Sequence, residues 1–600
     1  MKNLRIKIKT ARQLGYNPIF HVVLYRLKLK LGWYALYFRK VDALPAGLFL
    51  KEQVKQQPLH KFEPVQSWQN KAPPDWHLNS QTGKRGDAST PWWKLSDFDS
   101  ELGDIKCVWE ASRFAWVLAL VERHVSGDVD ALPRLNQWLS DWCENNPAYQ
   151  GLNWKCGQET GIRILHLAMG ALLLEQVQDS SSCLLHLVKA HIKRILPTLR
   201  YAMSQDNNHG TSEAAALFIG GSWLARCGGV EGARWERLGR RWLENRIERL
   251  ISSDGTFSQY SVNYHRLLLD TLCMVELWRR ALDLPEFSED YTNKAKAAVH
   301  WLAAMVDSTT GYAPNLGAHD GALLFSLVDC DSRDFRPTVQ TSMVLFEHAR
   351  AYLDEGHWDA PLAWFQVDLP EKIIQNKQNK LFDDGGFAVL QNEQSMALLR
   401  YPRFRFRPSQ ADALHVDLWL KGVNHLRDAG TYGYNTEPEW LNYFSGTKSH
   451  NTIQFDDRDQ MPRLGRFLLG DWLKTEAVEQ INIADENASF SASYRDNKAC
   501  YHKRKISLSE TNFRVTDQVS GFSEKAILRW RLLPGDWRIV GTSVVSKHAR
   551  LTIVSNIAIS RIALVTGWES RYYLQKEDVP VLEVEIHQPG ELISHYEWTL

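Results

Sequence analysis

Four clusters of polar residues interrupt otherwise apolar stretches of the sequence, and each holds side chains that could do chemistry. Burying such groups costs free energy unless they are hydrogen-bonded or used. In the first cluster, Asn207, Asn208 and His209 come just before a predicted helix. Glu213 follows His209 by four residues, which places both side chains on one helical face. These groups could bind a negative charge or move a proton. The alternative is an ordinary helix start with an asparagine cap.

The second cluster presents Tyr260, Tyr264 and His265 between a turn and an apolar helix. A tyrosine hydroxyl serves as a proton donor or acceptor when nearby cations or amides lower its pKa. The alternative is that these rings pack in the core with their polar ends at its edge.

The third and fourth clusters follow in the last third of the chain. His415 and Asp417 alternate along a predicted strand and therefore share one face, and we expect Asp428 and His450 on separate strands. Asp417, Asp428 and His450 together offer the ligand types of a divalent-metal site. No close-spaced signature such as HExxH is present, so this hypothesis rests on residue type alone.

The elements that carry these clusters change character near residue 380. Before this point, apolar residues recur with helical spacing, which predicts antiparallel helix pairs in an open solenoid or a toroid. After it, short runs rich in β-branched and aromatic residues alternate with period two, which predicts a two-layer antiparallel sandwich. We therefore predict a basic, irregular N-terminal segment packed on the helices (1–95), a helical domain (96–375) and an antiparallel β-sandwich (376–600).

Composition limits the classes of function. A chain of 600 residues is too long for one core, and its 44% hydrophobic and 24% charged residues are those of a globular protein. The net charge of +1 gives no global support for nucleic-acid binding, so no such partner is expected. The eight cysteines are scattered without a CxxC pair, and buried free thiols are the simplest interpretation.

The first forty residues contain ten Lys or Arg and no Asp or Glu. Arg26, Lys28 and Lys30 interrupt the apolar stretch there, so neither a signal peptide nor a membrane span is predicted. Two interpretations stay open, a solvated basic segment and an arm that lies on an anionic membrane face. We expect a cytoplasmic protein, either free or at the inner membrane face, in preference to a periplasmic one.

Taken together, these residues resemble the heparinase II/III family of polysaccharide lyases, which join an incomplete α/α toroid to an antiparallel β-sandwich. The resemblance covers about residues 100–600, and seven motifs in this order are specific where no single one would be. They are DIKCVWEASRFAW (104–116), LNWKCGQETGIR (152–163), NNHGTSEA (207–214), DGTFSQYSVNYHR (254–266), NLGAHDGALL (315–324), HVD with RDAGTYGY (415–434) and YFSGTKSHNT (443–452).

The resemblance implies β-elimination on an acidic, uronic-acid-containing polysaccharide. Asn208 would contact the substrate carboxylate, Tyr264 would be the catalytic tyrosine, and His415 would be the histidine supplied by the sandwich. The remaining members of the first two clusters would bind substrate, namely Asn207, His209, Glu213, Tyr260 and His265.

Asp417, Asp428 and His450 match the family's metal-proximal residues, which implies one divalent ion, zinc or calcium, with a structural role. Two positions depart from the family pattern. Asp417 stands where some relatives have a second histidine, which makes zinc less secure, and His319 stands where asparagine is more familiar. Many relatives also carry a secretion signal that this sequence lacks, which puts an extracellular degradative role in doubt.

Elimination from C4 of a uronate requires a neutralised C6 carboxylate, a base at C5 and a proton donor at O4. Asn208, supported by His209, suits the first task. Tyr264 suits proton transfer, and His415 is expected as the base or as a stabiliser of charge. A cleft between the helical and strand regions would bring these residues together.

Two other functions stay open. A glycoside hydrolase on the same helical scaffold would need two carboxylates, drawn from Glu110, Glu159, Glu213 and Asp254. A non-catalytic or biosynthesis-associated glycan-binding protein of a bacterial surface polysaccharide pathway would fit the basic arm and the missing signal.

Overall fold

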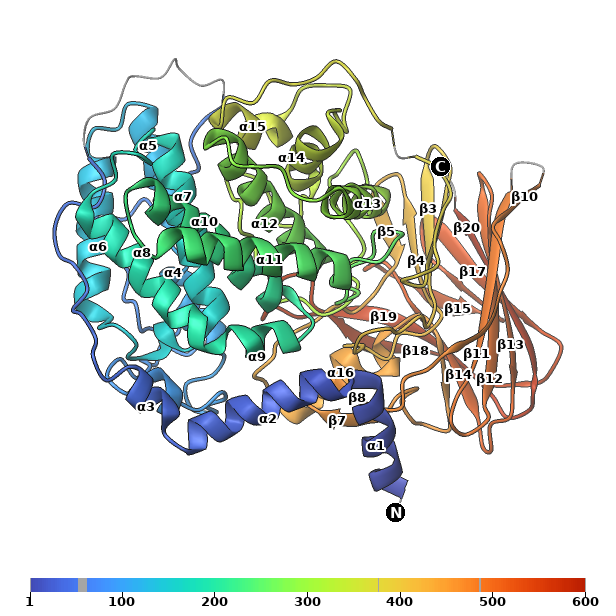
Figure 1. The fold of residues 1–600 in the computed structure, drawn as a ribbon. Helices are drawn as coiled ribbons and strands as arrows, with labels where there is room; N and C mark the ends of the chain where they lie inside the picture. Colours follow the sequence, from blue (N-terminus) through green and yellow to red (C-terminus); the bar gives the residue numbers. More distant parts are fainter. Residues whose placement is uncertain (1, 52–61, 376, 485–486, 599–600) are drawn as a thin grey trace.

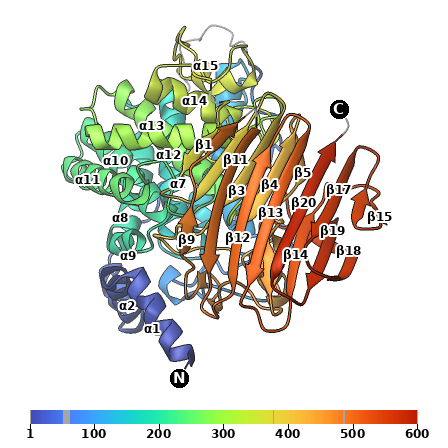
Figure 2. The same ribbon diagram turned by 90° about the vertical axis from the view of Figure 1, so that its right-hand side faces the viewer.

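The computed structural model describes residues 2–51, 62–375, 377–484 and 487–598. A helical half and a half built of sheets lie side by side, and the first helices run along one edge of the molecule (Figures 1 and 2). The predicted fold class, a helical toroid followed by an antiparallel β-sandwich, is confirmed.

The helical half surrounds one central helix, α10, whose side chains are buried on nearly all sides. A Cβ atom added at Gly239 would lie 2.2 Å from the Phe218 nitrogen, so this glycine lets α11 pack against the backbone of α10. The helices are α4 (Lys106–Ser112), α5 (Ala115–Val125), α6 (Ala131–Asn145), α7 (Gly157–Leu173), α8 (Ser182–Ile195), α9 (Leu199–Ser204), α10 (Asn208–Arg226), α11 (Gly232–Leu250), α12 (Val262–Ala281), α13 (Glu289–Met305), α14 (Arg336–Glu347) and α15 (Ala360–Trp364). The 3-10 turns are η1 (Trp92–Lys94), η2 (Leu152–Trp154), η3 (Leu196–Thr198), η4 (His357–Asp359) and η5 (Thr447–Ser449).

The N-terminal segment is not wholly irregular, which corrects the prediction for residues 1–95. It begins with three helices, α1 (Lys2–Leu14), α2 (Tyr16–Lys30) and α3 (Trp33–Tyr37). The unbranched side chains of Lys and Arg lose little conformational freedom in a helix, so the many basic residues of this segment are compatible with helices. Tyr25 of α2 stacks on Tyr201 with ring centroids 3.9 Å apart, and this packing holds the helix on the toroid.

The sheet half has two layers. One layer joins a five-stranded sheet and a four-stranded sheet, and it packs against a nine-stranded sheet. The five-stranded sheet contains β1 (Lys380–Phe382), β2 (Phe387–Gln391), β3 (Ser395–Arg400), β4 (His415–Leu420) and β5 (Val423–Leu426). The four-stranded sheet contains β6 (Ile453–Phe455), β14 (Ala526–Arg531), β18 (Ile559–Glu569) and β19 (Glu577–Ile586). The nine-stranded sheet contains β9 (Thr475–Val478), β10 (Asn482–Ala484), β11 (Asn487–Arg495), β12 (Tyr501–Leu508), β13 (Asn512–Ser520), β15 (Arg538–Val540), β16 (Ser543–Val545), β17 (Ala549–Ser555) and β20 (Gly590–Trp598). A separate hairpin pairs β7 (Arg463–Gly465) with β8 (Leu468–Leu469), and α16 (Pro438–Ser445) precedes it.

Strands β2, β3 and β4 of the five-stranded sheet are buried on both faces and lie between the helices and the nine-stranded sheet. On β4, Val416 and Leu418 belong to the core shared with the nine-stranded sheet, whereas Trp419 belongs to the core shared with the helices. Because side chains alternate along a strand, His415 and Asp417 also face the helical half. In the described part of the chain, no helix is both long and apolar enough to span a membrane.

Candidate active site

A cavity of about 790 Å³ lies where three parts of the chain meet. The helical half supplies Asn208 and Tyr264, the sandwich supplies Arg407 and Tyr434, and α2 supplies residues such as Ile19. Polar groups from distant parts of the sequence therefore face one space, as expected of a binding site between domains.

The start of α10 delivers the first cluster to the cavity, because Asn207 caps this helix. Its Oδ1 accepts a hydrogen bond from the His209 nitrogen at 3.1 Å. Asn208 is held from two sides: its backbone nitrogen donates to Gln259 Oε1 at 2.8 Å, and its Nδ2 donates to Gln158 Oε1 at 3.0 Å. The Asn208 amide is thus fixed before a ligand arrives.

His209 and Glu213 both line the cavity, as their four-residue spacing predicts. Burial raises the pKa of Glu213 to about 8, although His209 acts in the opposite direction. Burial likewise lowers the pKa of His209. Both side chains are therefore mostly neutral at pH 7. Glycine at position 157 makes room for this carboxyl group, since a Cβ there would lie 2.5 Å from Glu213 Oε1.

Tyr264 meets a second tyrosine across the boundary between the halves. Ser261 caps α12 by accepting a hydrogen bond from the Tyr264 nitrogen at 3.1 Å, which places the phenol on the first turn. The Tyr264 hydroxyl lies 2.7 Å from the Tyr434 hydroxyl. Burial and the nearby Asp320 carboxylate raise the pKa of both phenols well above the usual value, and Arg407 acts against this shift at Tyr434. Both phenols are protonated at rest.

Arg407 is a cation of the cavity wall that, unlike the exposed Arg26 and Arg405, is partly buried in it. It is half-buried, and within the described residues its guanidinium makes no hydrogen bond or ion pair. Its loop is held by Tyr260, whose hydroxyl accepts hydrogen bonds from the backbone nitrogens of Arg405 at 2.9 Å and Phe406 at 3.0 Å. A charge that is positioned but unpaired suits an anionic ligand.

Two of the expected substrate-binding residues do not line the cavity. Tyr260 is occupied with the loop just described. His265 stacks on Trp301 at 4.4 Å, and its Nε2 lies 2.8 Å from the Ala298 carbonyl oxygen. Burial lowers its pKa to about 4, so it is a neutral core residue.

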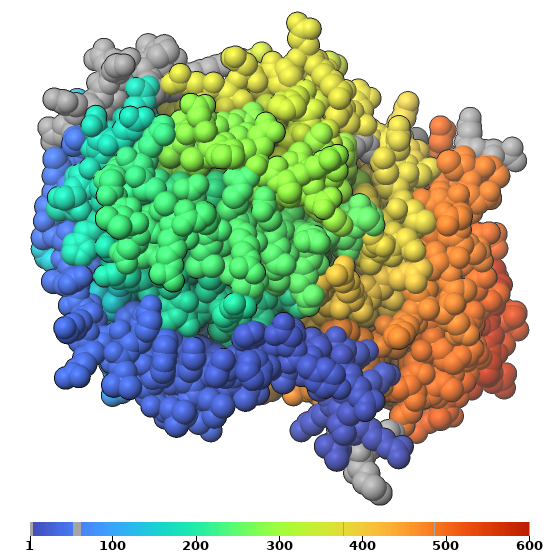
Figure 3. All heavy atoms as spheres, viewed as in Figure 1, coloured from blue at the N-terminus to red at the C-terminus, as the bar shows by residue number. Residues whose placement is uncertain are grey.

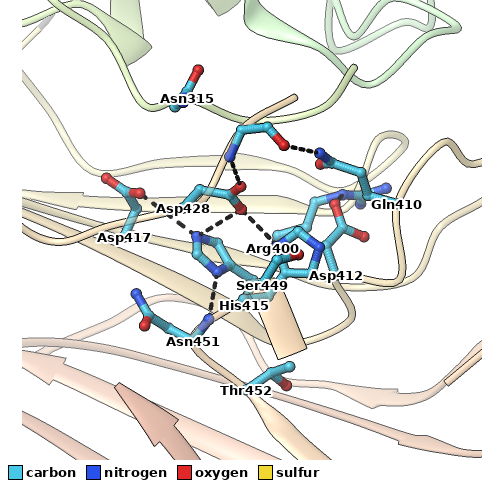
Figure 4. Close-up of polar contacts among 12 residues, drawn as sticks. Asn315, Arg400, Gln410, Asp412, His415, Asp417, Asp428, Ser449, Asn451 and Thr452 are labelled. Carbon is cyan, nitrogen blue, oxygen red and sulfur yellow. Dashed lines mark hydrogen bonds and ion pairs between the residues drawn. The ribbon is translucent and has the colours of Figure 1, made fainter. Parts of the chain in front are cut away.

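His415 also does not join Asn208 and Tyr264 at the cavity, so the expected convergence of these three side chains is incomplete. Its ring is fully buried and does not line the cavity. Nδ1 accepts a hydrogen bond from the Asn451 nitrogen at 3.0 Å, and Nε2 lies 3.6 Å from Asp417 Oδ2 and 3.5 Å from Asp428 Oδ2 (Figure 4). The sandwich presents Tyr434 to the cavity instead.

His415, Asp428 and His450 form the fully buried one of two groups in the described residues that could hold a metal ion; the other, Cys330, Asp334 and His357, is partly exposed. The ligand atoms of His415, Asp428 and His450 lie within 4.8 Å of one another, and this group shares Asp428 and His450 with the predicted set of Asp417, Asp428 and His450, which stays a prediction. Asp417 Oδ1 accepts hydrogen bonds from Trp419 and Asn424, whereas its buried Oδ2 has no hydrogen-bond partner among the described residues and lies 3.6 Å from His415 Nε2. Asp428 and His450 lie on loops rather than on strands, since turns bring them to the end of β4.

The residue types of this group, two imidazoles and a carboxylate, are those that bind a divalent cation. The Nε2 atoms of His415 and His450 are buried and have no hydrogen-bond partner among the described residues. Burial opposes ionisation of Asp428, but the two imidazoles lower its pKa, and Asp428 in turn raises the pKa of His450. One contact opposes metal binding as the ring now stands: because His415 Nδ1 accepts a hydrogen bond from the Asn451 nitrogen, the neutral ring carries its proton on Nε2. His415 could bind an ion through Nε2 only if this contact were broken and the proton moved to Nδ1.

A chain of contacts links this cluster to the cavity. Asp428 Oδ1 accepts a hydrogen bond from the Gly430 nitrogen at 2.7 Å. The Gly430 carbonyl accepts one from Gln410 Nε2 at 3.1 Å, and Gln410 Oε1 accepts one from the Gly317 nitrogen in the helical half at 3.0 Å. The cluster therefore fixes the start of the segment that ends in Tyr434.

The carboxylates considered for a hydrolase do not form a suitable pair. Glu110 and Asp254 do not line the cavity. Both oxygens of Glu159 accept hydrogen bonds from Arg113, at 2.6 and 2.8 Å, and Glu213 is mostly protonated. This chemistry needs a protonated carboxylic acid and an ionised carboxylate on either side of a sugar bond, so Glu213 could serve as the acid but none of the other three is free in the cavity to be its partner.

Sequence reasoning missed Arg407 and Tyr434. Tyr434 lies in the quoted segment RDAGTYGY, but nothing in the sequence indicated which of its two tyrosines faces the helices. Arg407 is the last residue of the alternating run RFRFR, and nothing in the sequence distinguishes it as a ligand-binding residue from the other two arginines of the run.

Comparisons with known proteins agree with this architecture. The family described as "Heparinase II/III N-terminus" matches residues 53–316, and "Heparinase II/III-like, C-terminal" matches residues 374–571. No curated protein matches the chain. A crystal structure of heparinase III superposes with a TM-score of 0.65 at 14% identity, covering 96% of this chain and 91% of that one. The heparan sulfate lyase HepC from Pedobacter heparinus gives 0.54 at 18% identity, covering 82% and 77%.

Proposed function

The chain belongs to the heparinase II/III family, and from this premise we propose that it is a polysaccharide lyase that cleaves a uronic-acid-containing glycan by β-elimination. The observation that carries the proposal is the pair of phenols, Tyr264 and Tyr434, which meets between the halves beside an unpaired Arg407. The substrate is an acidic polysaccharide or oligosaccharide.

The first task of the site is to neutralise the C6 carboxylate, so that the C5 proton becomes acidic enough to remove. Arg407 is suited to bind this group as an ion pair, with the fixed Asn208 amide as a further donor. Both are in place without the substrate, which lowers the reorganisation needed at the moment of reaction.

Proton transfer then follows from the protonation states. His209 is neutral at pH 7 and accepts the C5 proton, while the protonated Tyr264 donates a proton to the leaving O4. The electrons of the C5–H bond form the C4–C5 double bond as the C4–O4 bond breaks. Tyr434 is hydrogen-bonded to Tyr264 and supports the transient phenolate.

We further propose that one divalent ion is held by His415, Asp428 and His450 and has a structural role. Two imidazoles and a carboxylate are ligands that zinc accepts, whereas calcium prefers oxygen. When bound, it would balance the buried carboxylate charge and secure the segment leading to Tyr434.

The test is a product assay. Purified protein is incubated with a panel of uronic-acid polymers, and ultraviolet absorbance of the conjugated double bond is followed together with new reducing ends. Elimination gives both signals. Reducing ends without absorbance would indicate hydrolysis, and glycan binding without either signal would favour a non-catalytic protein; each of these results contradicts the proposal.

A further inference from the structure

Helix α2 carries a row of apolar side chains on its outer surface. Tyr16, Phe20, Val23, Leu27 and Leu31 are exposed by 79, 60, 49, 48 and 79%. Their spacing of four, three, four and four residues puts them on one side of the helix, with Leu31 at its C-terminal cap. The helix therefore exposes a continuous apolar stripe.

Helix α2 attaches to the protein by the side opposite to the stripe. On this side, Tyr25 stacks on Tyr201, and Leu29 and the following Trp33 pack against the core of the helical half. Ile19 lines the cavity, and so does Val23, which is the one stripe residue that does; Tyr16, Phe20, Leu27 and Leu31 do not. Helix α2 thus has two apolar faces, and only one of them is used by the fold.

The neighbouring helices extend the exposed surface. On α1, Leu4 and Ile8 are exposed by 62 and 45%, and on α3, Leu36 and Tyr37 are exposed by 72 and 45%. Eleven of the 22 exposed large apolar side chains in the described residues fall within the first 48 residues. Figure 3 shows these helices as a band along the lower side of the molecule. Such a concentration is typical of an interaction surface.

Charge indicates the partner. The first forty residues hold ten Lys or Arg without a single acidic residue. Lys30 lies beside the apolar stripe, and Arg39 and Lys40 follow α3 as exposed side chains. Apolar side chains flanked by cations match the acyl and headgroup layers of an anionic membrane.

We propose that the α1–α3 surface docks on the face of an anionic lipid bilayer. The stripe of α2 enters the boundary between headgroups and acyl chains, and the flanking cations contact the headgroups. Because the inner side of the same helix lines the cavity, docking holds the cavity close to the membrane surface.

The test is sedimentation of the full-length protein with vesicles of phosphatidylcholine alone or mixed with phosphatidylglycerol. We expect binding to the mixed vesicles and little to the neutral ones. The triple variant Phe20→Ser, Leu27→Ser, Leu31→Ser should bind roughly 10-fold or more weakly. These residues do not line the cavity, so lyase activity on a soluble glycan should be unchanged.

A matched control replaces exposed apolar residues elsewhere, with Val230→Ser and Leu353→Ser, and should bind as the wild type does. A charge variant, Lys30→Gln, Arg39→Gln, Lys40→Gln, should lose much of the preference for anionic vesicles. Equal binding of the wild type and the apolar triple variant would overturn the proposal. So would an oligomer in lipid-free solution that the triple variant converts to monomers, because the stripe would then be an interface between copies.

Discussion

The hydroxyls of Tyr264 and Tyr434 share a hydrogen bond, but the two phenols have different proposed roles: Tyr264 donates the proton, and Tyr434 supports the resulting phenolate. We expect Tyr264→Phe to lower kcat by roughly 100- to 10,000-fold, because the proton donor to O4 is lost. Tyr434→Phe should have a smaller effect, since Tyr264 keeps its own proton. Initial rates of ultraviolet-absorbing product measure both, with Tyr501→Phe in the sandwich as control. Wild-type rates in Tyr264→Phe would refute the assignment.

Arg407 acts on binding more than on proton transfer. We expect Arg407→Gln to lower kcat/KM by roughly 10- to 100-fold, mainly through a higher KM, with partial recovery in Arg407→Lys because the charge returns without the planar fork. Arg403→Gln, on the same loop but outside the cavity, is the control. An unchanged KM in Arg407→Gln would show that the carboxylate binds elsewhere.

We expect the enzyme to be active when the Glu213 side chain is protonated and therefore uncharged. Its pKa of about 8 means that it is mostly protonated at pH 7 and ionises as the pH rises further. A new negative charge in the cavity would then repel an acidic substrate. We expect wild-type activity to fall above pH 8, and the fall to be smaller in Glu213→Gln, whose amide stays neutral. Parallel pH profiles of the two proteins would contradict this role.

At the scale of elements, Glu122 on the buried helix α5 couples folding to pH. Burial raises its pKa to about 8, and its Oε2 accepts a hydrogen bond from the Val65 nitrogen at 3.0 Å. The folded protein keeps this proton between about pH 4.5 and 8, whereas the unfolded chain releases it. The free energy of unfolding therefore falls as pH rises through this window.

Between pH 5 and pH 8, the free energy of unfolding should fall by roughly 2–5 kcal/mol less in Glu122→Gln than in the wild type, because an amide cannot ionise. Denaturant unfolding of both proteins at pH 5 and pH 8 gives the difference. Glu144→Gln, on the exposed side of the next helix, is the control. The same pH dependence in wild type and Glu122→Gln would disprove the shift.

Most of the helices and strands could be predicted from the sequence because the patterns that indicate them are local. Helical spacing and period-two alternation depend on neighbours in the chain, so the change from helices to strands was predicted correctly. The helices at the N-terminus were missed because Arg26, Lys28 and Lys30 were weighed only against a signal peptide and a membrane span. A helix turns such residues away from its packed face, and this possibility was not considered for the segment.

The site was readable only in part, for a related reason. Asn207, Asn208 and Tyr264 lie at helix starts, where caps and turns are visible in the sequence. Which loop residue of the sandwich meets them depends on how the two halves pack, and no local pattern records this. His415 was therefore expected where Tyr434 lies.

At the scale of the whole molecule, hydrogen bonds through Gly430 and Gln410 link the cluster of His415, Asp428 and His450 to the cavity. We expect about one equivalent of zinc in the purified protein, measured by elemental analysis, and its loss in His450→Ala. Activity should fall with the metal, because the segment leading to Tyr434 loses its anchor. His357→Ala is the control, since Asp334 beside it is already paired with Arg336. Metal-free, fully active protein would contradict an ion at this cluster.

Because three parts of the chain form the wall of the cavity, recombination between related genes should affect activity more than folding. Arg407 and Tyr434 come from one half, Asn208 and Tyr264 from the other, and α2 closes the space between them. A hybrid gene that takes its first and second halves from different relatives would inherit each half intact, yet join two sets of loops that were never selected together. Recombination within this family should therefore preserve folding more often than activity, and the halves should evolve as matched partners.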